Sequence, residues 1–339
     1  MFVVIICSLI AILFTFLESR GTFPNGMKLG FVLVTILGVI HYDFGNDYMS
    51  YYSVYESIKD VPFDFELIMS GDLYREPGWV FLNYLFKPVG GFFMLVAVLS
   101  IIQNVIIYNF IKNEVSVKWY PLAVFVYLYT TSYFLLSFTM LRQWFVACVF
   151  LWSWSLIKQR KWIVSLVILY LCSLVHSSAI ILLPFAFWGF LPLRKSKVYA
   201  VLFVVLIIAL WFSGGWVESL LEKTMTITET ESYYERYDVE RNTFTFGLGV
   251  ILQFIPLFVG EFFLYNAENY PKEQKLLVAI SLLGFAITPL NQVMPMIGRL
   301  GIYFGIFSIA SLSITYAYIK KPIIRWGFLG LFLFITGYN

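Results

Sequence analysis

Residues 162–193 read WIVSLVILYLCSLVHSSAIILLPFAFWGFLPL, which is 32 positions without a charged side chain between Lys161 and Arg194. A transmembrane α-helix needs about 20 residues, so this stretch is either one overlong helix or two short ones. The polar run His176-Ser177-Ser178 lies near its middle, where a hairpin would turn. The choice decides on which side of a membrane every later segment lies.

The whole chain has the composition of a membrane protein. It is 60% hydrophobic and only 13% charged over 339 residues, about half the charged share of a soluble domain. Apolar runs recur from end to end without a soluble-sized block between them. We therefore expect an all-α, polytopic fold, one transmembrane domain over residues 1–339, membrane lipid around it and no nucleic-acid partner.

Twelve windows approach spanning length, several of them short, which predicts about 11–12 transmembrane helices. They are residues 2–17, 27–41, 90–111, 120–137, 142–157, 162–176, 177–192, 198–214, 244–265, 275–291, 296–318 and 322–338. Only two connections are long, residues 42–89 and 215–243.

The distribution of basic residues favours the hairpin, because Lys and Arg gather on the cytoplasmic side. With the N-terminus outside and a turn at His176, fifteen of the 23 lysines and arginines lie inside. One long helix would instead put Arg194, Lys195 and Lys197 outside. Both long loops carry more acidic than basic residues, so both are predicted to be periplasmic.

A few ionisable residues remain within or beside the apolar runs, where a charge costs several kcal/mol. They are Arg142, His176, Glu261 and Arg299, with Arg75 and Glu76 before an apolar region. Taken one at a time, each arginine can extend its charged end to the membrane interface, and the histidine can hydrogen-bond backbone carbonyls at a helix turn. Arg142, His176, Arg299 and Arg75 all fall on the predicted outer side, however, which favours a shared basic cluster. Glu261 lies near the predicted cytoplasmic end and is interpreted as interfacial.

The stretch YREPGW at residues 74–79 starts a predicted helix. Pro77 suits a first helical turn, and Glu76 before it can act as a cap facing the positive helix end. Arg75 has no such explanation, because a cation is unfavourable there unless an anion is near. Arginine suits pyrophosphate, because its planar fork donates two parallel charge-assisted bonds.

Two further features lie in the predicted outer loops. Asp47 precedes Tyr48, Tyr51, Tyr52 and Tyr55, whose spacing places the rings on one helical face. Such a face beside a carboxylate either binds sugar or forms an interfacial aromatic belt. In the second loop, ten residues separate Arg236 from Gly247, a weak match to a spacing seen in polysaccharide polymerases.

Motifs for cofactor or metal chemistry are missing from the sequence. There is no phosphate-binding loop, zinc-protease motif or nucleophile elbow, and two histidines make a histidine-built metal site improbable. Cys7, Cys148 and Cys172 sit in apolar runs without ligand spacing and are interpreted as buried apolar residues. We expect neither a cofactor nor a metal.

Several short motifs together resemble the EpsG-like family of bacterial polysaccharide polymerases, which is related in role to the Wzy polymerases of O-antigen and capsule. The matching pieces are Gly45-Asn46-Asp47-Tyr48 with Tyr51, Arg75-Glu76-Pro77-Gly78, Leu141-Arg142-Gln143, His176-Ser177-Ser178-Ala179, and Arg299 with Tyr303. The resemblance implies a GT-C-like fold in the bacterial inner membrane, with the active site facing the periplasm. It implies transfer of a growing glycan from undecaprenyl pyrophosphate to the non-reducing end of another lipid-linked repeat unit, with a chain-length regulator as a candidate partner.

Such a glycosyltransferase must hold the departing pyrophosphate and deprotonate a sugar hydroxyl. We expect Arg75, Arg142 and Arg299 to bind the pyrophosphate, and His176, Glu76 or Asp47 to act as the base. Candidate sugar contacts are Tyr48, Tyr51, Gln143, Tyr303 and Arg236. The alternatives are an O-antigen ligase or envelope-sugar acyltransferase, and a flippase or transporter of lipid-linked oligosaccharides. Transport is less favoured because the predicted midplane holds almost no charge.

Overall fold

The computed structural model describes residues 2–129, 133–192, 201, 205, 248–266, 270–288, 295–327 and 329–330. The second long loop, residues 215–243, lies outside these ranges, as does Arg236. The described chain divides into two compact units. Unit 1 comprises Met1–Leu191 and Ile306–Asn339, and unit 2 comprises Pro192–Gly305. The prediction of one transmembrane domain stays a prediction.

The described residues form helices and no strand, as the composition predicts. Unit 1 contains α1 (Phe2–Ser19), α2 (Gly26–Ile40), α3 (Tyr48–Ile58), α4 (Phe65–Ser70), α5 (Pro77–Phe86), η1 (Lys87–Val89), α6 (Gly91–Glu114), η2 (Val117–Trp119), α7 (Tyr120–Tyr129), α8 (Tyr133–Thr139), α9 (Leu141–Lys158), α10 (Trp162–Val175), η3 (Ser177–Phe190) and α17 (Ser308–Tyr318). Unit 2 contains α14 (Leu248–Asn266), α15 (Lys272–Ile287) and α16 (Pro295–Gly305).

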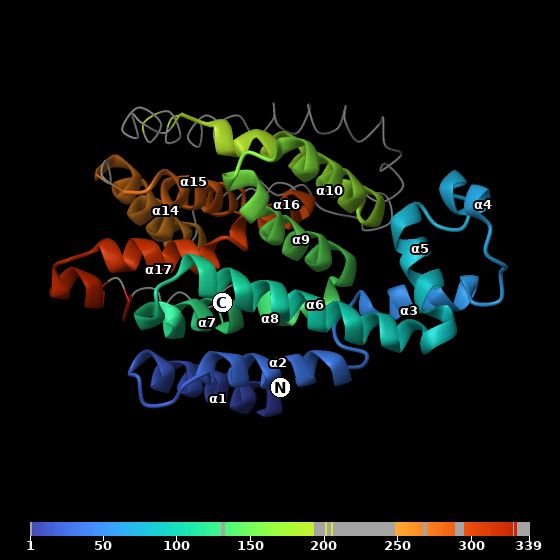
Figure 1. The fold of residues 1–339 in the computed structure, drawn as a ribbon, viewed down its shortest axis with the longest axis horizontal. Coiled ribbons are helices and arrows are strands. Elements are labelled where there is room, and N and C mark those ends of the chain that lie inside the picture. The colour runs from blue at the N-terminus through green and yellow to red at the C-terminus, as the bar shows by residue number, and fades with distance from the viewer. Residues whose placement is uncertain are drawn as a thin grey trace. The chain divides into compact units, whose positions relative to one another are not determined.

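Three segments are long and apolar enough to cross a bilayer, namely Phe2–Ser19, Gly91–Glu114 and Val117–Thr139, the last of which includes residues 130–132 from outside the described ranges. Several shorter helices are also apolar, among them α2, α10 and η3. The chain is therefore an all-α, polytopic membrane protein. In unit 1, α1 packs on α2, α2 on α6 and α6 on α9, and these helices run side by side in Figure 1.

The uncharged stretch forms a hairpin, as the basic-residue count predicts. α10 ends at Val175, His176 adopts an extended backbone (φ −148°, ψ 113°), and the 3₁₀-helix η3 begins at Ser177. The rings of Trp162, at the start of α10, and Phe187, near the end of η3, stack with centroids 5.3 Å apart. The two segments are therefore antiparallel. At about 2.0 Å per residue, the 14 residues of η3 extend roughly 28 Å, close to the hydrocarbon thickness.

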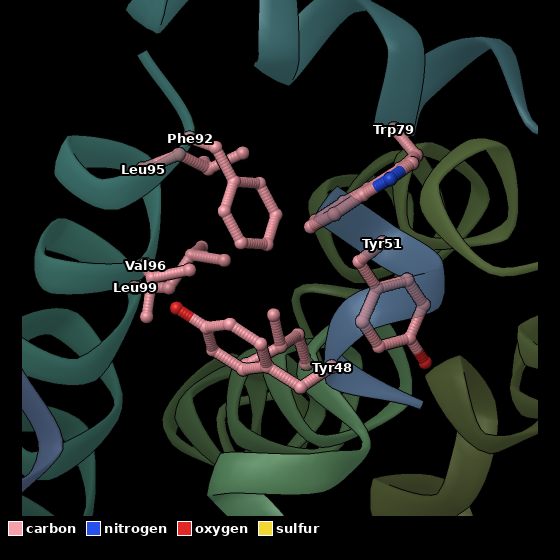
Figure 2. Close-up of a cluster of buried hydrophobic side chains, with 8 residues drawn as sticks. Tyr48, Tyr51, Trp79, Phe92, Leu95, Val96 and Leu99 are labelled. Carbon is pink, nitrogen blue, oxygen red and sulfur yellow. The ribbon is translucent and has the colours of Figure 1, made fainter. Parts of the chain in front are cut away.

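The first long loop, residues 42–89, folds into α3, α4 and α5. α3 packs its tyrosine face on the first turns of α6, where Tyr48 and Tyr52 each lie 5.5 Å from Phe92 between ring centroids. α5 begins at Pro77, whose fixed φ suits a first helical turn. Figure 2 shows the resulting buried cluster, built from Tyr48, Tyr51, Trp79, Phe92, Leu95, Val96, Leu99 and Leu141.

Unit 2 is held by close approach of small residues. A Cβ on Gly284 of α15 would lie 2.4 Å from the amide nitrogen of Gly305 in α16, so Gly284 has no room for a larger side chain. Close backbone contact of this kind is typical of helix pairs in membranes. Glu261 of α14, predicted to be interfacial, is instead 6% exposed, and neither of its carboxylate oxygens has a hydrogen-bond partner within the described residues.

Candidate functional site

Three charged or titratable side chains meet where α5, α9 and α10 come together. Glu76 immediately precedes α5, Arg142 is the second residue of α9, and His176 immediately follows α10. α5 packs on α10 and α10 packs on α9, which brings the three positions together. Two of the predicted outer-side residues, Arg142 and His176, therefore do lie at one site.

Glu76 is the centre of this cluster. Its Oε2 forms an ion pair with Nη1 of Arg142. Its Oε1 accepts a hydrogen bond from Nδ1 of His176 at 3.2 Å and from the amide and hydroxyl of Ser177 at 3.3 and 3.4 Å. Glu76 occupies the N-cap position of α5, but its side chain makes no cap hydrogen bond. Its partners lie on α9 and after α10 instead.

Arg142 is enclosed by aromatic rings. Its guanidinium carbon lies 4.9 Å from the ring centroid of Tyr51 and 5.1 Å from that of Tyr74. The side chain is only 13% exposed, and its Nε is buried with no hydrogen-bond partner among the described residues. A partly desolvated cation between two rings is stabilised by their negative faces. Arg142 is therefore held in place, with one donor still unused.

The electrostatics keep the Glu76 carboxyl ionised. Burial alone would raise the pKa of Glu76, but the hydrogen bond from His176 and the charge of Arg142 outweigh it and lower this pKa to about 2. Burial raises the pKa of Tyr51 to about 12 although the charge of Arg142 opposes it, so the phenol stays neutral. Glu76 and Arg142 thus compensate each other's charge.

The hydrogen bond between Glu76 and His176 defines the histidine tautomer. An ionised carboxylate only accepts hydrogen bonds, so Nδ1 of His176 must carry the proton. In the neutral ring, Nε2 then holds the lone pair. The His176 side chain is 18% exposed, whereas Glu76 is 7% exposed. A carboxylate that orients a histidine in this way leaves its far nitrogen available as a base.

The other predicted residues of the first loop have different surroundings. Arg75 is exposed and has no hydrogen bond or ion pair to another described residue. Asp47 is half-buried at the start of α3 and makes no side-chain cap bond. Gln143, next to Arg142 in α9, is buried.

Tyr48 and Tyr51 lie on one helical face, as predicted, but that face packs into the protein. Tyr48 is 0% exposed and Tyr51 is 6% exposed. In this arrangement Tyr48 has no ring face open to a sugar, because Phe92 and the side chain of His41 pack against it. Tyr51 contacts Arg142 rather than solvent. Tyr48 therefore packs in the core and Tyr51 packs against the guanidinium of Arg142. Neither ring lies at a surface on which a sugar could stack.

The remaining predicted residues belong to unit 2 or to the part of the chain outside the described residues. Arg299 and Tyr303 belong to α16 of unit 2, so a shared site with Arg142 stays a prediction. Arg236 falls outside the described residues. No group of three His, Cys, Asp or Glu side chains that could hold a metal occurs in the described ranges.

Sequence reasoning assigned no role to Tyr74 or Ser177. Tyr74 lies two positions before Glu76, and Ser177 directly follows His176, so adjacency to charged residues was the only available signal. The sequence does not show that the ring of Tyr74 lies beside the guanidinium of Arg142, or that Ser177 donates to the carboxylate of Glu76. Each contact joins segments that are far apart in the sequence.

Together, the apolar helices and the buried ionised cluster at one helix junction define a polytopic membrane protein with a polar site. The family model of the EpsG family matches residues 26–338, nearly the whole chain. The protein therefore belongs to the EpsG family, which suggests a polysaccharide-polymerase-like function with lipid-linked saccharides as substrates. No curated protein and no solved structure shows a significant match.

Proposed function

We propose that this protein polymerises lipid-linked oligosaccharide repeat units at the periplasmic face of the bacterial inner membrane. The donor is a glycan on undecaprenyl pyrophosphate, and the acceptor is the non-reducing end of a second lipid-linked repeat unit. The observation that carries the proposal is the Glu76–His176 pair beside Arg142, a base and its orienting carboxylate next to a cation. Family membership supplies the substrate class.

In this mechanism His176 is the general base. Its Nε2 accepts the proton of the acceptor hydroxyl while that oxygen attacks the donor's anomeric carbon. The bond between that carbon and the pyrophosphate oxygen breaks, and undecaprenyl pyrophosphate departs as an anion. The histidine then releases its proton to solvent. This direct displacement inverts the anomeric carbon; a two-step route through an enzyme-bound glycan would retain it.

Glu76 serves as the orienting residue rather than the base. A carboxyl with a pKa of about 2 binds protons weakly, and both of its oxygens already accept hydrogen bonds. Asp47, half-buried at the start of α3, remains a candidate for bonding acceptor hydroxyls.

We expect Arg75 to be the first cation that contacts the pyrophosphate. It is exposed, and it adjoins Glu76 in the chain. Arg142 is already compensated by Glu76, so its contribution is a buried donor group at the site rather than a free charge. Arg299 of unit 2 is the third proposed contact with the pyrophosphate.

The experiment is a reconstitution of purified protein with lipid-linked repeat units alone. A ladder of products differing by one repeat supports polymerisation, and its absence overturns the proposal. If product forms only with lipid A core, the protein is a ligase. A requirement for an acyl donor identifies an acyltransferase, and movement of the lipid-linked unit between leaflets without extension identifies a flippase.

A further inference from the structure

Gly78 lies in the first turn of α5, two residues after Glu76, and faces the last turn of α10. A Cβ on Gly78 would lie 2.7 Å from the carbonyl carbon of Leu174, 2.8 Å from its oxygen and 2.9 Å from the amide nitrogen of Val175. These are backbone atoms, which cannot move away by changing rotamer. Among the amino acids only glycine lets the two helices approach so closely.

The residues in this contact are close neighbours in the chain of Glu76 and His176. His176 follows Val175, and Glu76 is separated from Gly78 only by Pro77, whose ring restricts φ and limits how the backbone can adjust. The Oε1 of Glu76 is 3.2 Å from Nδ1 of His176 and 3.3 Å from the amide of Ser177. Both distances are already at the long end for hydrogen bonds, which are lost at about 3.6 Å.

Ordinary van der Waals contact of a Cβ begins at 3.4 Å, so an added methyl would separate the two backbones by several tenths of an ångström. That shift is enough to break the bonds from His176 and Ser177 to Glu76. The ion pair with Arg142 approaches from α9 and does not depend on the same contact.

We propose that Gly78 is a positioning residue, which sets the spacing of α5 and α10 at which Glu76 orients His176. Its catalytic consequence rests on the proposed function above, whereas its geometric consequence does not. Gly78 has no side chain to touch a substrate and acts only through the Glu76–His176 pair.

The first measurement is spectroscopic and needs no substrate. The chain has only two histidines, so selective ¹⁵N labelling gives one Nδ1–H signal for His176 and one for His41, whose Nδ1 bonds the carbonyl of Gly38 at 2.6 Å. In Gly78→Ala we expect the signal of hydrogen-bonded His176 to disappear, as in Glu76→Ala, which has no acceptor at this position, while that of His41 stays. Retention of the His176 signal in Gly78→Ala overturns the proposal.

The second measurement is the rate of repeat-unit addition. Gly78→Ala should lower kcat about 100-fold, since small misplacements of a catalytic group cost this much, with little change in KM. The matched control is Gly30→Ala, whose Cβ would also press on backbone, 3.0 Å from Cα of Ala11, but between α1 and α2. It should keep both the His176 signal and kcat. Equal losses of kcat in the two variants would overturn a positioning role for Gly78.

Glu76→Asp covers the case in which Gly78→Ala does not fold. It withdraws the carboxylate by one methylene without moving either backbone, so the same loss of the His176 signal is expected. A retained signal would show that the hydrogen bond tolerates a changed distance between Glu76 and His176, and would overturn the spacing role proposed for Gly78. Loss of the signal in either variant with unchanged polymerisation would leave the spacing role intact and overturn the function proposed for His176.

Discussion

Glu76 and His176, 100 residues apart in the sequence, meet through Oε1 and Nδ1 at 3.2 Å. The same carboxylate pairs with Arg142 through its other oxygen. One buried acid therefore orients a histidine and compensates a cation at once. Replacing it should separate these two effects, because stability depends mainly on the ion pair and catalysis on the histidine.

Glu76→Gln should lower the free energy of unfolding by about 3 kcal/mol, since it leaves the buried guanidinium of Arg142 without a counter-charge. Thermal or steric-trap unfolding in detergent measures this loss. The double variant Glu76→Gln/Arg142→Met should recover much of the stability but none of the polymerising activity. If the double variant is less stable than Glu76→Gln by the full cost of Arg142→Met, the two residues are not coupled.

The contacts of the Glu76 carboxylate with His176 and Arg142 also predict a pH dependence of stability. The pKa of Glu76 falls from an ordinary 4.5 to about 2 on folding, so its contribution is fully present above pH 4.5 and is lost as the pH falls towards 2. The linked free energy is about 3 kcal/mol. Subtracting the melting curves of Glu76→Gln from those of the wild type at each pH isolates it. A difference that stays constant down to pH 2 would contradict the assignment.

His176→Gln should reduce kcat by about 100- to 10,000-fold, the usual contribution of a general base. Since its ring is bound through Nδ1 to a residue that Arg142 also holds, folding should change little. His41→Gln is the matched control, because His41 lies on a different segment and is not proposed to touch substrate. A His176→Gln enzyme with wild-type kcat would remove His176 from the mechanism.

Arg75→Ala should raise KM for the lipid-linked donor and leave unfolding unchanged, because the side chain is exposed and unpaired among the described residues. The effect should shrink as salt rises, since exposed charges are screened. Lys59→Ala is the control in the same loop, where Lys59 pairs with Glu56 at 2.5 Å. Equal KM values for both variants would assign Arg75 no specific role.

Tyr48→Phe tests whether Tyr48 packs in the core or binds sugar. Its hydroxyl is buried and has no hydrogen-bond partner in the described part of the chain, so removing it should leave stability equal or slightly higher and activity unchanged. Tyr48→Ala should cost about 3–5 kcal/mol of unfolding free energy through the cavity it leaves. A selective rise in KM for the acceptor in Tyr48→Phe would instead restore a sugar-binding role.

The sequence predicts the fold well because its signals are local. Uncharged runs mark the apolar helices, Pro77 marks the start of α5, and the basic residues around residues 162–193 select a turn at His176. The tyrosine spacing likewise predicts the face of α3. What that face meets depends on how the first loop folds back on α6, which no local pattern encodes.

For the site, the sequence shows which residues carry charge beside apolar segments, but not which of them pair. Arg142 looked like a free cation and Glu76 like a helix cap, yet they form an ion pair with each other across 66 residues of sequence. Arg75, the odd residue of YREPGW, is the one left exposed. Pairing is decided by how α5, α9 and α10 pack, and therefore by contacts such as that of Gly78.

The distances in sequence within the cluster have a consequence for biosynthesis. Glu76 leaves the ribosome 66 residues before Arg142 and 100 before His176. At synthesis rates of 5–20 residues per second, its carboxylate waits roughly 5–20 s for the last partner. During that interval α6, α7, α8, α9 and α10 are still being synthesised. The cluster therefore cannot form until α5, α9 and α10 have all been synthesised.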